Sequence, residues 1–81
     1  MENFDRQTLR DLADEGNETA LDRLADLADA EELSELLDEG SMRAGFLLTQ
    51  RAVAARDLRE LQRIADAGYE PASLELEKLL N

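Results

Sequence analysis

Apolar residues recur at helical spacing on both sides of three glycines, Gly16, Gly40 and Gly68. Each glycine has an aliphatic residue seven and four positions before it, an alanine four positions after it and a leucine eight positions after it. Residues at these spacings fall on one face of an α-helix. The pattern therefore predicts that each glycine joins two amphipathic helices.

The residues around each glycine indicate how the chain turns there. Glycine adopts the left-handed conformation that ends many helices at no steric cost. Asn17 and Ser41 are good caps for a following helix, and Pro71 suits a first turn, where its missing N–H costs nothing. We therefore expect six helices, over approximately residues 5–15, 18–29, 31–39, 42–55, 57–67 and 71–80.

The helix expected at residues 42–55 differs from the others. It is apolar on most of its circumference, which is typical of a helix buried on more than one side. The interval between corner glycines also grows from 24 to 28 residues, and one helix or its loop can absorb this extra turn. Gly45 costs about 1 kcal/mol relative to alanine inside a helix, so we expect another backbone to cross there.

The composition favours helices over strands. Leucine and alanine supply most apolar residues, whereas Val53 and Ile64 are the only Val and Ile, and this balance suits helix packing. We expect one all-α domain over residues 1–81, with three stacked helical pairs in an α-solenoid-like repeat. Its predicted buried residues are Leu12, Leu24, Leu36, Leu48, Leu61, Ile64, Leu76 and Phe46.

Three segments share a pattern of small and aliphatic residues: "LADEGNETALDRL" from Leu12, "LLDEGSMRAGFLL" from Leu36 and "IADAGYEPASLEL" from Ile64. They resemble the Sel-like repeats of the tetratricopeptide superfamily, whose signature is A-A-x-x-G-x-x-x-A-x-x-x-L. The repeat here is shorter than in that family, the Trp and Tyr positions are not filled, and the second glycine of each unit is missing. The segments resemble HEAT-like helical pairs equally well. Either resemblance implies an α-solenoid fragment that acts as a protein-binding scaffold.

The chain is strongly acidic, with 20 Asp or Glu against nine Lys or Arg and a net charge of −11. Phosphate backbones and anionic membranes require a basic surface, so neither nucleic acid nor a membrane is expected as a partner. The first 40 residues hold 14 of the carboxylates and three arginines. They form either a solvated surface or a docking surface for a basic partner. A Ca²⁺ site is not expected, because the D-x-D-x-D-G loop is missing.

The residue types that are missing exclude several chemistries. Without Cys and His, the chain has no thiol nucleophile, no thiolate or imidazole metal ligand and no usual general base near neutral pH. We therefore expect a protein that is not an enzyme and that binds no cofactor or metal. A catalytic carboxylate would require a pocket with a strongly perturbed Asp or Glu. The segment "MENFDRQTL" is not a signal peptide and no apolar run could span a membrane, so a cytoplasmic location is expected.

Arginines concentrate in the middle of the chain, where residues 41–63 carry a net charge of +3. Arg56, Arg59 and Arg63 have the i, i+3, i+7 spacing of a single helix face, here expected on the fifth helix. Together with Arg51, they allow two interpretations. They pair with carboxylates on neighbouring helices, or they form a basic stripe for an acidic partner or for the acidic end of a second copy.

These features predict a non-enzymatic protein–protein interaction module. Its partner would be a protein or peptide, or a second copy of the chain, bound in a groove lined by the second, fourth and sixth helices beside the arginines. The expected ligand is a helix or an extended peptide with acidic and apolar residues. Tyr69, next to the third corner glycine, is either a packing residue or an interface anchor. Leu74 lies off the buried stripe of the last helix, which leaves room for self-association.

The alternative function is an acidic mimic of nucleic acid that inhibits a basic protein. Such a mimic would require carboxylates arrayed along one long face with a spacing like that of phosphates. An arginine stripe in the middle of the chain argues against it.

Overall fold

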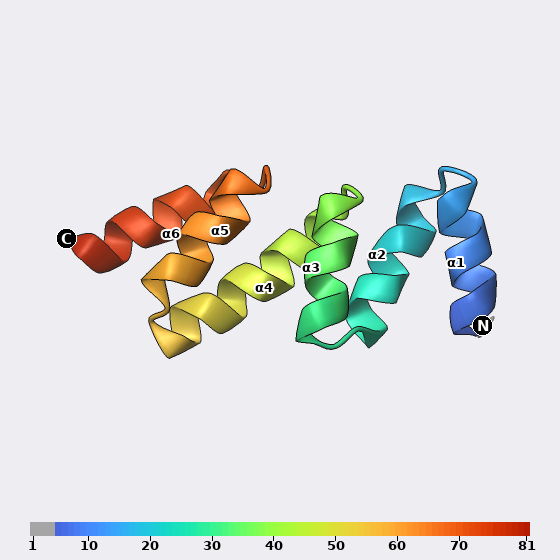
Figure 1. The fold of residues 1–81 in the computed structure, drawn as a ribbon, viewed down its shortest axis with the longest axis horizontal. Helices are drawn as coiled ribbons and strands as arrows, with labels where there is room; N and C mark the ends of the chain where they lie inside the picture. Colours follow the sequence, from blue (N-terminus) through green and yellow to red (C-terminus); the bar gives the residue numbers. More distant parts are fainter. Residues whose placement is uncertain (1–4) are drawn as a thin grey trace.

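Residues 5–81 form six α-helices in the computed structural model, and no strand occurs in this range (Figure 1). The helices are α1 (Arg6–Asp14), α2 (Glu18–Leu27), α3 (Ala30–Asp38), α4 (Met42–Ala55), α5 (Leu58–Asp66) and α6 (Pro71–Leu80). The predicted all-α class is confirmed, and each predicted helix has a counterpart with similar boundaries. The longer interval between the second and third corner glycines is explained by α4, which has 14 residues.

A polar side chain begins five of the six helices. In each case an oxygen of the residue before the helix accepts a hydrogen bond from the backbone N–H three residues later, which satisfies a donor that has no partner within the helix. The capping residues are Asp5, Asn17, Asp29, Ser41 and Asp57. The sixth helix starts without a side-chain cap and has Pro71 in its first turn, as the sequence predicted.

The three corner glycines are left-handed, as predicted, with φ of 98° at Gly16, 105° at Gly40 and 112° at Gly68. Each is part of a Schellman motif. The N–H of Gly16 donates to the carbonyl of Ala13, and the N–H of Asn17 donates to the carbonyl of Leu12. These two bonds satisfy carbonyls that the end of a helix leaves free. Glycine occupies these positions because a Cβ atom would be strained at such φ values.

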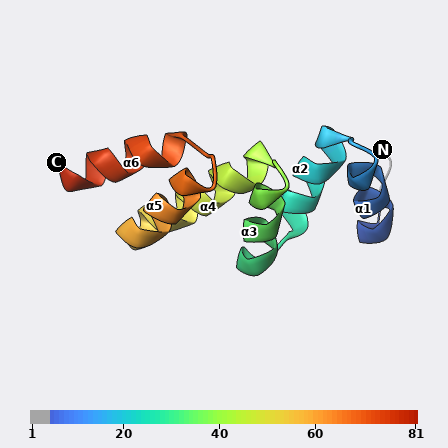
Figure 2. The same cartoon turned by 45° about the horizontal axis from the view of Figure 1, so that its top comes forward.

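The helices stack as three antiparallel pairs, α1–α2, α3–α4 and α5–α6, along a body of 44 × 20 × 19 Å. The second helices of the pairs contact one another in succession, α2 on α4 and α4 on α6, whereas the backbones of α1, α3 and α5 stay apart. As a result α4 contacts α2, α3, α5 and α6, which confirms that it is buried on more than one side. Figures 1 and 2 show α1 and α6 at opposite ends of the molecule.

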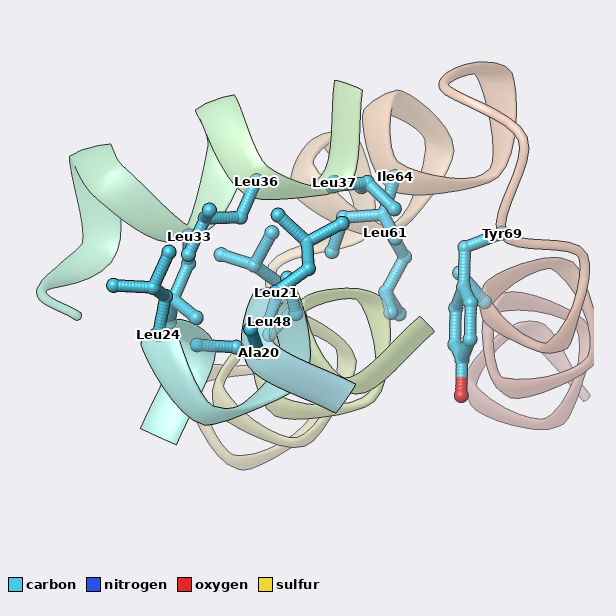
Figure 3. Packing of buried hydrophobic residues seen from close by; sticks show 14 of the residues in the cluster. Ala20, Leu21, Leu24, Leu33, Leu36, Leu37, Leu48, Leu61, Ile64 and Tyr69 are labelled. Carbon is cyan, nitrogen blue, oxygen red and sulfur yellow. The ribbon is translucent and has the colours of Figure 1, made fainter. Parts of the chain in front are cut away.

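Leucine and alanine side chains fill the interior between the pairs (Figure 3). The predicted core positions Leu24, Leu36, Leu48, Leu61 and Ile64 are buried. Leu12 and Leu76 are only half-buried, which corrects the prediction; they belong to the two end pairs, each of which packs against one neighbouring pair.

The prediction for Phe46 was wrong: its side chain is 40% exposed. It lies on the side of α4 that faces the start of α6, where the two helices do not close over it. The aromatic ring of α4 therefore borders an open surface rather than the core.

No helix within residues 5–81 has both the length and the apolar character needed to cross a membrane.

Candidate protein-binding groove

A groove of about 740 Å³ lies between α4 and α6. Its lining comes from one side of α4, from the corner before α6 and from the first turns of α6. The lining residues are Phe46, Thr49, Gln50, Val53, Ala54, Tyr69, Pro71 and Glu75. We call this surface the α4–α6 groove. Its lining is predominantly apolar, and Glu75 supplies its one charged side chain.

The repeat explains why a groove forms at this junction. At the preceding junction, between α2 and α4, polar side chains tie the two helices together. The Ser41 hydroxyl donates a hydrogen bond of 2.8 Å to Asp22 Oδ1 and also caps its own helix by accepting from the N–H of Ala44. Arg43 Nε donates to Asp26 Oδ1 at 2.7 Å. Short polar residues thus allow α2 and α4 to approach closely.

The same repeat positions hold different residues at the junction of α4 and α6. Counted from the corner glycine of each pair, Tyr69 stands where Ser41 stood, and Phe46 stands where Asp22 stood. Pro71 and Gln50 likewise replace the ion pair of Arg43 with Asp26. All four of these replacement residues line the groove. At this junction a bulky ring stands in place of serine and the two polar links are missing, and a groove lies beside the contact between α4 and α6.

Tyr69 packs against Gly45 on α4. A Cβ atom on Gly45 would lie 2.5 Å from Cδ1 and 2.6 Å from Cγ of the Tyr69 ring. The close approach predicted at Gly45 exists, but an aromatic side chain makes it rather than a crossing backbone, which corrects the prediction. Tyr69 is only 8% exposed, and Figure 3 shows its ring at one side of the leucine cluster. Its main role is therefore packing, and it offers little surface as an anchor.

Thr49 brings an unsatisfied polar group to the groove. Its side chain is buried, with 6% of its surface exposed, and its Oγ1 has no hydrogen-bond partner among residues 5–81. Ala25 holds the same repeat position in α2 and is fully buried there. A buried hydroxyl without a partner costs about 1–3 kcal/mol, so Thr49 is expected to lower the stability of the fold at this position.

Two charged side chains at the groove, Glu75 and Arg43, already have partners. Glu75 Oε1 accepts from Lys78 Nζ at 3.2 Å within α6. Arg43, at the other border, is paired with Asp26, and its guanidinium lies 5.4 Å from the centre of the Phe46 ring. A cation at this distance from an aromatic face is weakly attracted to it. The groove therefore presents an apolar surface with little uncompensated charge.

The predicted arginine stripe is only partly present. Arg56 lies outside α5, at the left-handed end of α4 with φ of 52°, so it does not share one helix face with Arg59 and Arg63, and that prediction was wrong. Arg63 pairs with Glu60 Oε1 at 2.6 Å and donates to Ser34 Oγ at 3.0 Å. Arg51, Arg56 and Arg59 are exposed and form no ion pair within residues 5–81.

None of these arginines lines the α4–α6 groove, and neither does any residue of α2. The groove residues other than Tyr69 were not recognised as site residues from the sequence. A comparison of equivalent repeat positions would have found them, because Asp22 and Asp26 in the first junction become Phe46 and Gln50 in the second.

A smaller hollow of about 220 Å³ lies between α1 and α3 and has a different character. Arg6 pairs with Glu32 across it, and Arg10 pairs with Glu39 and with Asp14. The hydrogen bonds to Glu39 and Asp14 raise the pKa of Arg10 above its ordinary value. The ion pairs across this hollow therefore link α1 to the segment that contains α3. Among the described residues, both arginines that line the hollow are already paired, so neither is free to bind a ligand.

The described part of the chain contains no group of three acidic side chains placed to hold a metal ion. No family model, no curated protein and no solved structure matches this chain.

Proposed function

We propose that this chain is a non-enzymatic protein-binding module and that the α4–α6 groove is its contact surface. One observation carries the proposal: Phe46, a large aromatic residue, borders an apolar groove instead of entering the core. Concave apolar surfaces on rigid elements are the usual place for a ligand. The wall formed by α4, which neighbouring pairs hold on both sides, supplies such a rigid surface at a small entropic cost.

The lining determines the chemistry of the partner. Since Glu75 is already paired with Lys78 and the other lining residues are uncharged, a charged ligand would gain little there. The favoured ligand presents uncharged, apolar side chains from a helix or an extended segment. This differs from the acidic ligand expected from the arginines, because the arginines lie elsewhere.

Photo-crosslinking from the groove tests the proposal. Gln50 lines the groove, and Gln62 is an equally exposed glutamine on α5 outside it. With benzoylphenylalanine at position 50, we expect a covalent adduct with a protein in the native host, and we expect none with the same group at position 62. The adduct should also disappear when Phe46→Glu is added. Adducts of equal yield at both positions, or no adduct at position 50, would contradict the proposal.

A further inference from the structure

We infer that the occupant of the α4–α6 groove is the same face of a second copy, in an antiparallel two-fold dimer. This inference rests on the proposed function, because it names the protein that the groove binds. Three independent features of the described residues support it: the shape of the face, the distribution of charge along the molecule, and the pairing of the charges next to the groove.

The face combines a hollow with protruding apolar side chains. Phe46 is 40% exposed, and Met42, one turn earlier on the same side of α4, is 60% exposed. On α6, Leu74 is 59% exposed and lies one turn after Pro71. In a two-fold interface the same residues serve both partners, so a surface needs projections and hollows together. Phe46 of each copy can enter the groove of the other.

Charge is distributed so that the half of the chain that contains the groove has no net charge. Residues 41–81 contain six basic and six acidic side chains, whereas residues 1–40 carry the whole net charge of −11. Two copies can therefore bring their α4–α6 faces together without net repulsion. The body is 44 Å long but about 20 Å wide. An antiparallel arrangement keeps the two acidic halves at opposite ends of the dimer, whereas a parallel one would place them side by side.

The pairs that border the groove favour a neutral partner over a charged one. Arg43 is held by Asp26, and Glu75 is held by Lys78. A strongly basic or acidic partner would have to compete with these two pairs. A second copy presents the same balanced face and meets this requirement.

The size of the face predicts a weak dimer. A standard interface buries about 800 Å² of each partner. The apolar side of α4 from Met42 to Val53 is only about 16 Å long at 1.5 Å per residue, so we expect the interface to bury less than this area. Interfaces at the small end of the range belong to transient complexes. We expect a dissociation constant of about 10⁻⁵ M.

Sedimentation equilibrium of the whole chain tests the inference. Over roughly 0.5–500 µM, on both sides of the expected constant, the weight-average mass should rise from near that of a monomer to near that of a dimer. Phe46→Glu should weaken association at least tenfold, because each interface would then contain two buried carboxylates. Leu27→Glu changes an exposed leucine of α2 outside the groove and should leave association unchanged. Circular dichroism checks that both variants keep their helices.

The orientation can be measured because the chain has no cysteine. A single cysteine introduced at Glu15, in the exposed corner after α1, carries one spin label per copy. In the antiparallel dimer the two labels should be separated by more than the 20 Å width of the molecule. A shorter separation would overturn the antiparallel arrangement.

The outcomes separate this inference from the proposed function. A mass that stays monomeric throughout, or association that Phe46→Glu does not weaken, overturns the dimer. If the adduct formed from position 50 then contains a different protein, the groove still binds protein and only its occupant was wrong. If no adduct forms at all, the proposed function fails as well.

Discussion

At the junction of α4 and α6, the ring of Tyr69 packs where a side chain on Gly45 would lie: a Cβ atom on Gly45 would be 2.5 Å from the tyrosine ring. The equivalent repeat positions in the preceding junction hold Leu21 and Ser41. At the junction of α2 and α4, the large Leu21 lies on the earlier helix and the small Ser41 at the corner. At the junction of α4 and α6 the sizes are reversed, so Tyr69 packs on α4 at Gly45 and the groove lies beside it.

Gly45→Ala should destabilise the protein by up to about 2 kcal/mol. Overpacking costs about 1–3 kcal/mol, which exceeds the gain in helix propensity of about 1 kcal/mol, because the clash is with Cγ and Cδ1 near the root of a buried ring. Urea unfolding measures the change in free energy. In a Tyr69→Ala background the same substitution should become stabilising, and destabilisation in both backgrounds would show that Tyr69 is not the cause.

Arg56→Gly should stabilise the protein by up to about 1 kcal/mol. Arg56 is the one non-glycine residue with positive φ within residues 5–81, at 52°. It occupies the Schellman position of the corner glycines, since its N–H donates to the carbonyl of Val53 and that of Asp57 donates to the carbonyl of Ala52. A side chain in this conformation costs about 1–2 kcal/mol, part of which the flexibility of an unfolded glycine offsets. Thermal unfolding decides the sign. Gly68→Ala, the opposite change at the equivalent corner, should lower the melting temperature.

Local chemistry made the corners predictable from the sequence. The left-handed end of a helix is a property of few residues, so Gly16, Gly40 and Gly68 marked it directly, and Asn17 and Ser41 marked the caps. The register of the buried leucines followed from the same spacing. Arg56 carried no such signal, because arginine has no preference for positive φ. In the structure Asp57, the next residue, caps the start of α5.

The groove was not predictable in the same way, because it depends on the distance between two helices. Phe46 has the chemistry of a core residue and was expected in the core. Its exposure depends on Tyr69, 23 positions later in the chain, which occupies the repeat position of Ser41. At the preceding junction Ser41 hydrogen-bonds Asp22 and so links α4 to α2. The α4–α6 groove depends on Phe46 and Tyr69 together, and the periodicity within one helix contains no information about this combination.

Thr49→Val should leave the fold intact and raise its stability by about 1 kcal/mol, since the substitution removes a buried hydroxyl that has no partner within the described residues. Chemical unfolding measures the change. Ser41→Ala is the matched control. It removes a buried hydroxyl that bonds both Asp22 and the N–H of Ala44, and it should cost about 1–2 kcal/mol. Equal losses in the two variants would indicate that Thr49 does have a partner.

Glu60 should titrate below the ordinary range for a glutamate. The hydrogen bond from Arg63 lowers the pKa of Glu60, and the same bond raises the pKa of Arg63. A carboxylate whose pKa is lower in the folded state stabilises the fold above the pKa of the unfolded chain, and this contribution is lost as the pH falls through the folded value. Carbon-13 NMR of the side-chain carboxyl reports the pKa. Arg63→Met should raise it, and Arg51→Met, which removes an exposed arginine that forms no ion pair within residues 5–81, should not.

Moderate salt should raise the melting temperature, because the acidic half of the molecule repels itself more than its ion pairs hold it. Exposed pairs such as Arg6 with Glu32 contribute at most about 1 kcal/mol each and weaken with salt. The excess of 11 negative charges in residues 1–40 is screened at the same time. Raising NaCl from about 10 mM to about 150 mM shortens the Debye length from about 30 Å to about 8 Å, which is less than the width of the body.

Scanning calorimetry at the two salt concentrations measures this effect. The double variant Glu15→Gln and Glu35→Gln removes two exposed charges that form no ion pair within residues 5–81, so its melting temperature should depend less on salt. Arg10→Met makes the same half more negative and should increase the dependence. A melting temperature that falls with salt in the unchanged protein would mean that the ion pairs between α1 and α3 outweigh the repulsion.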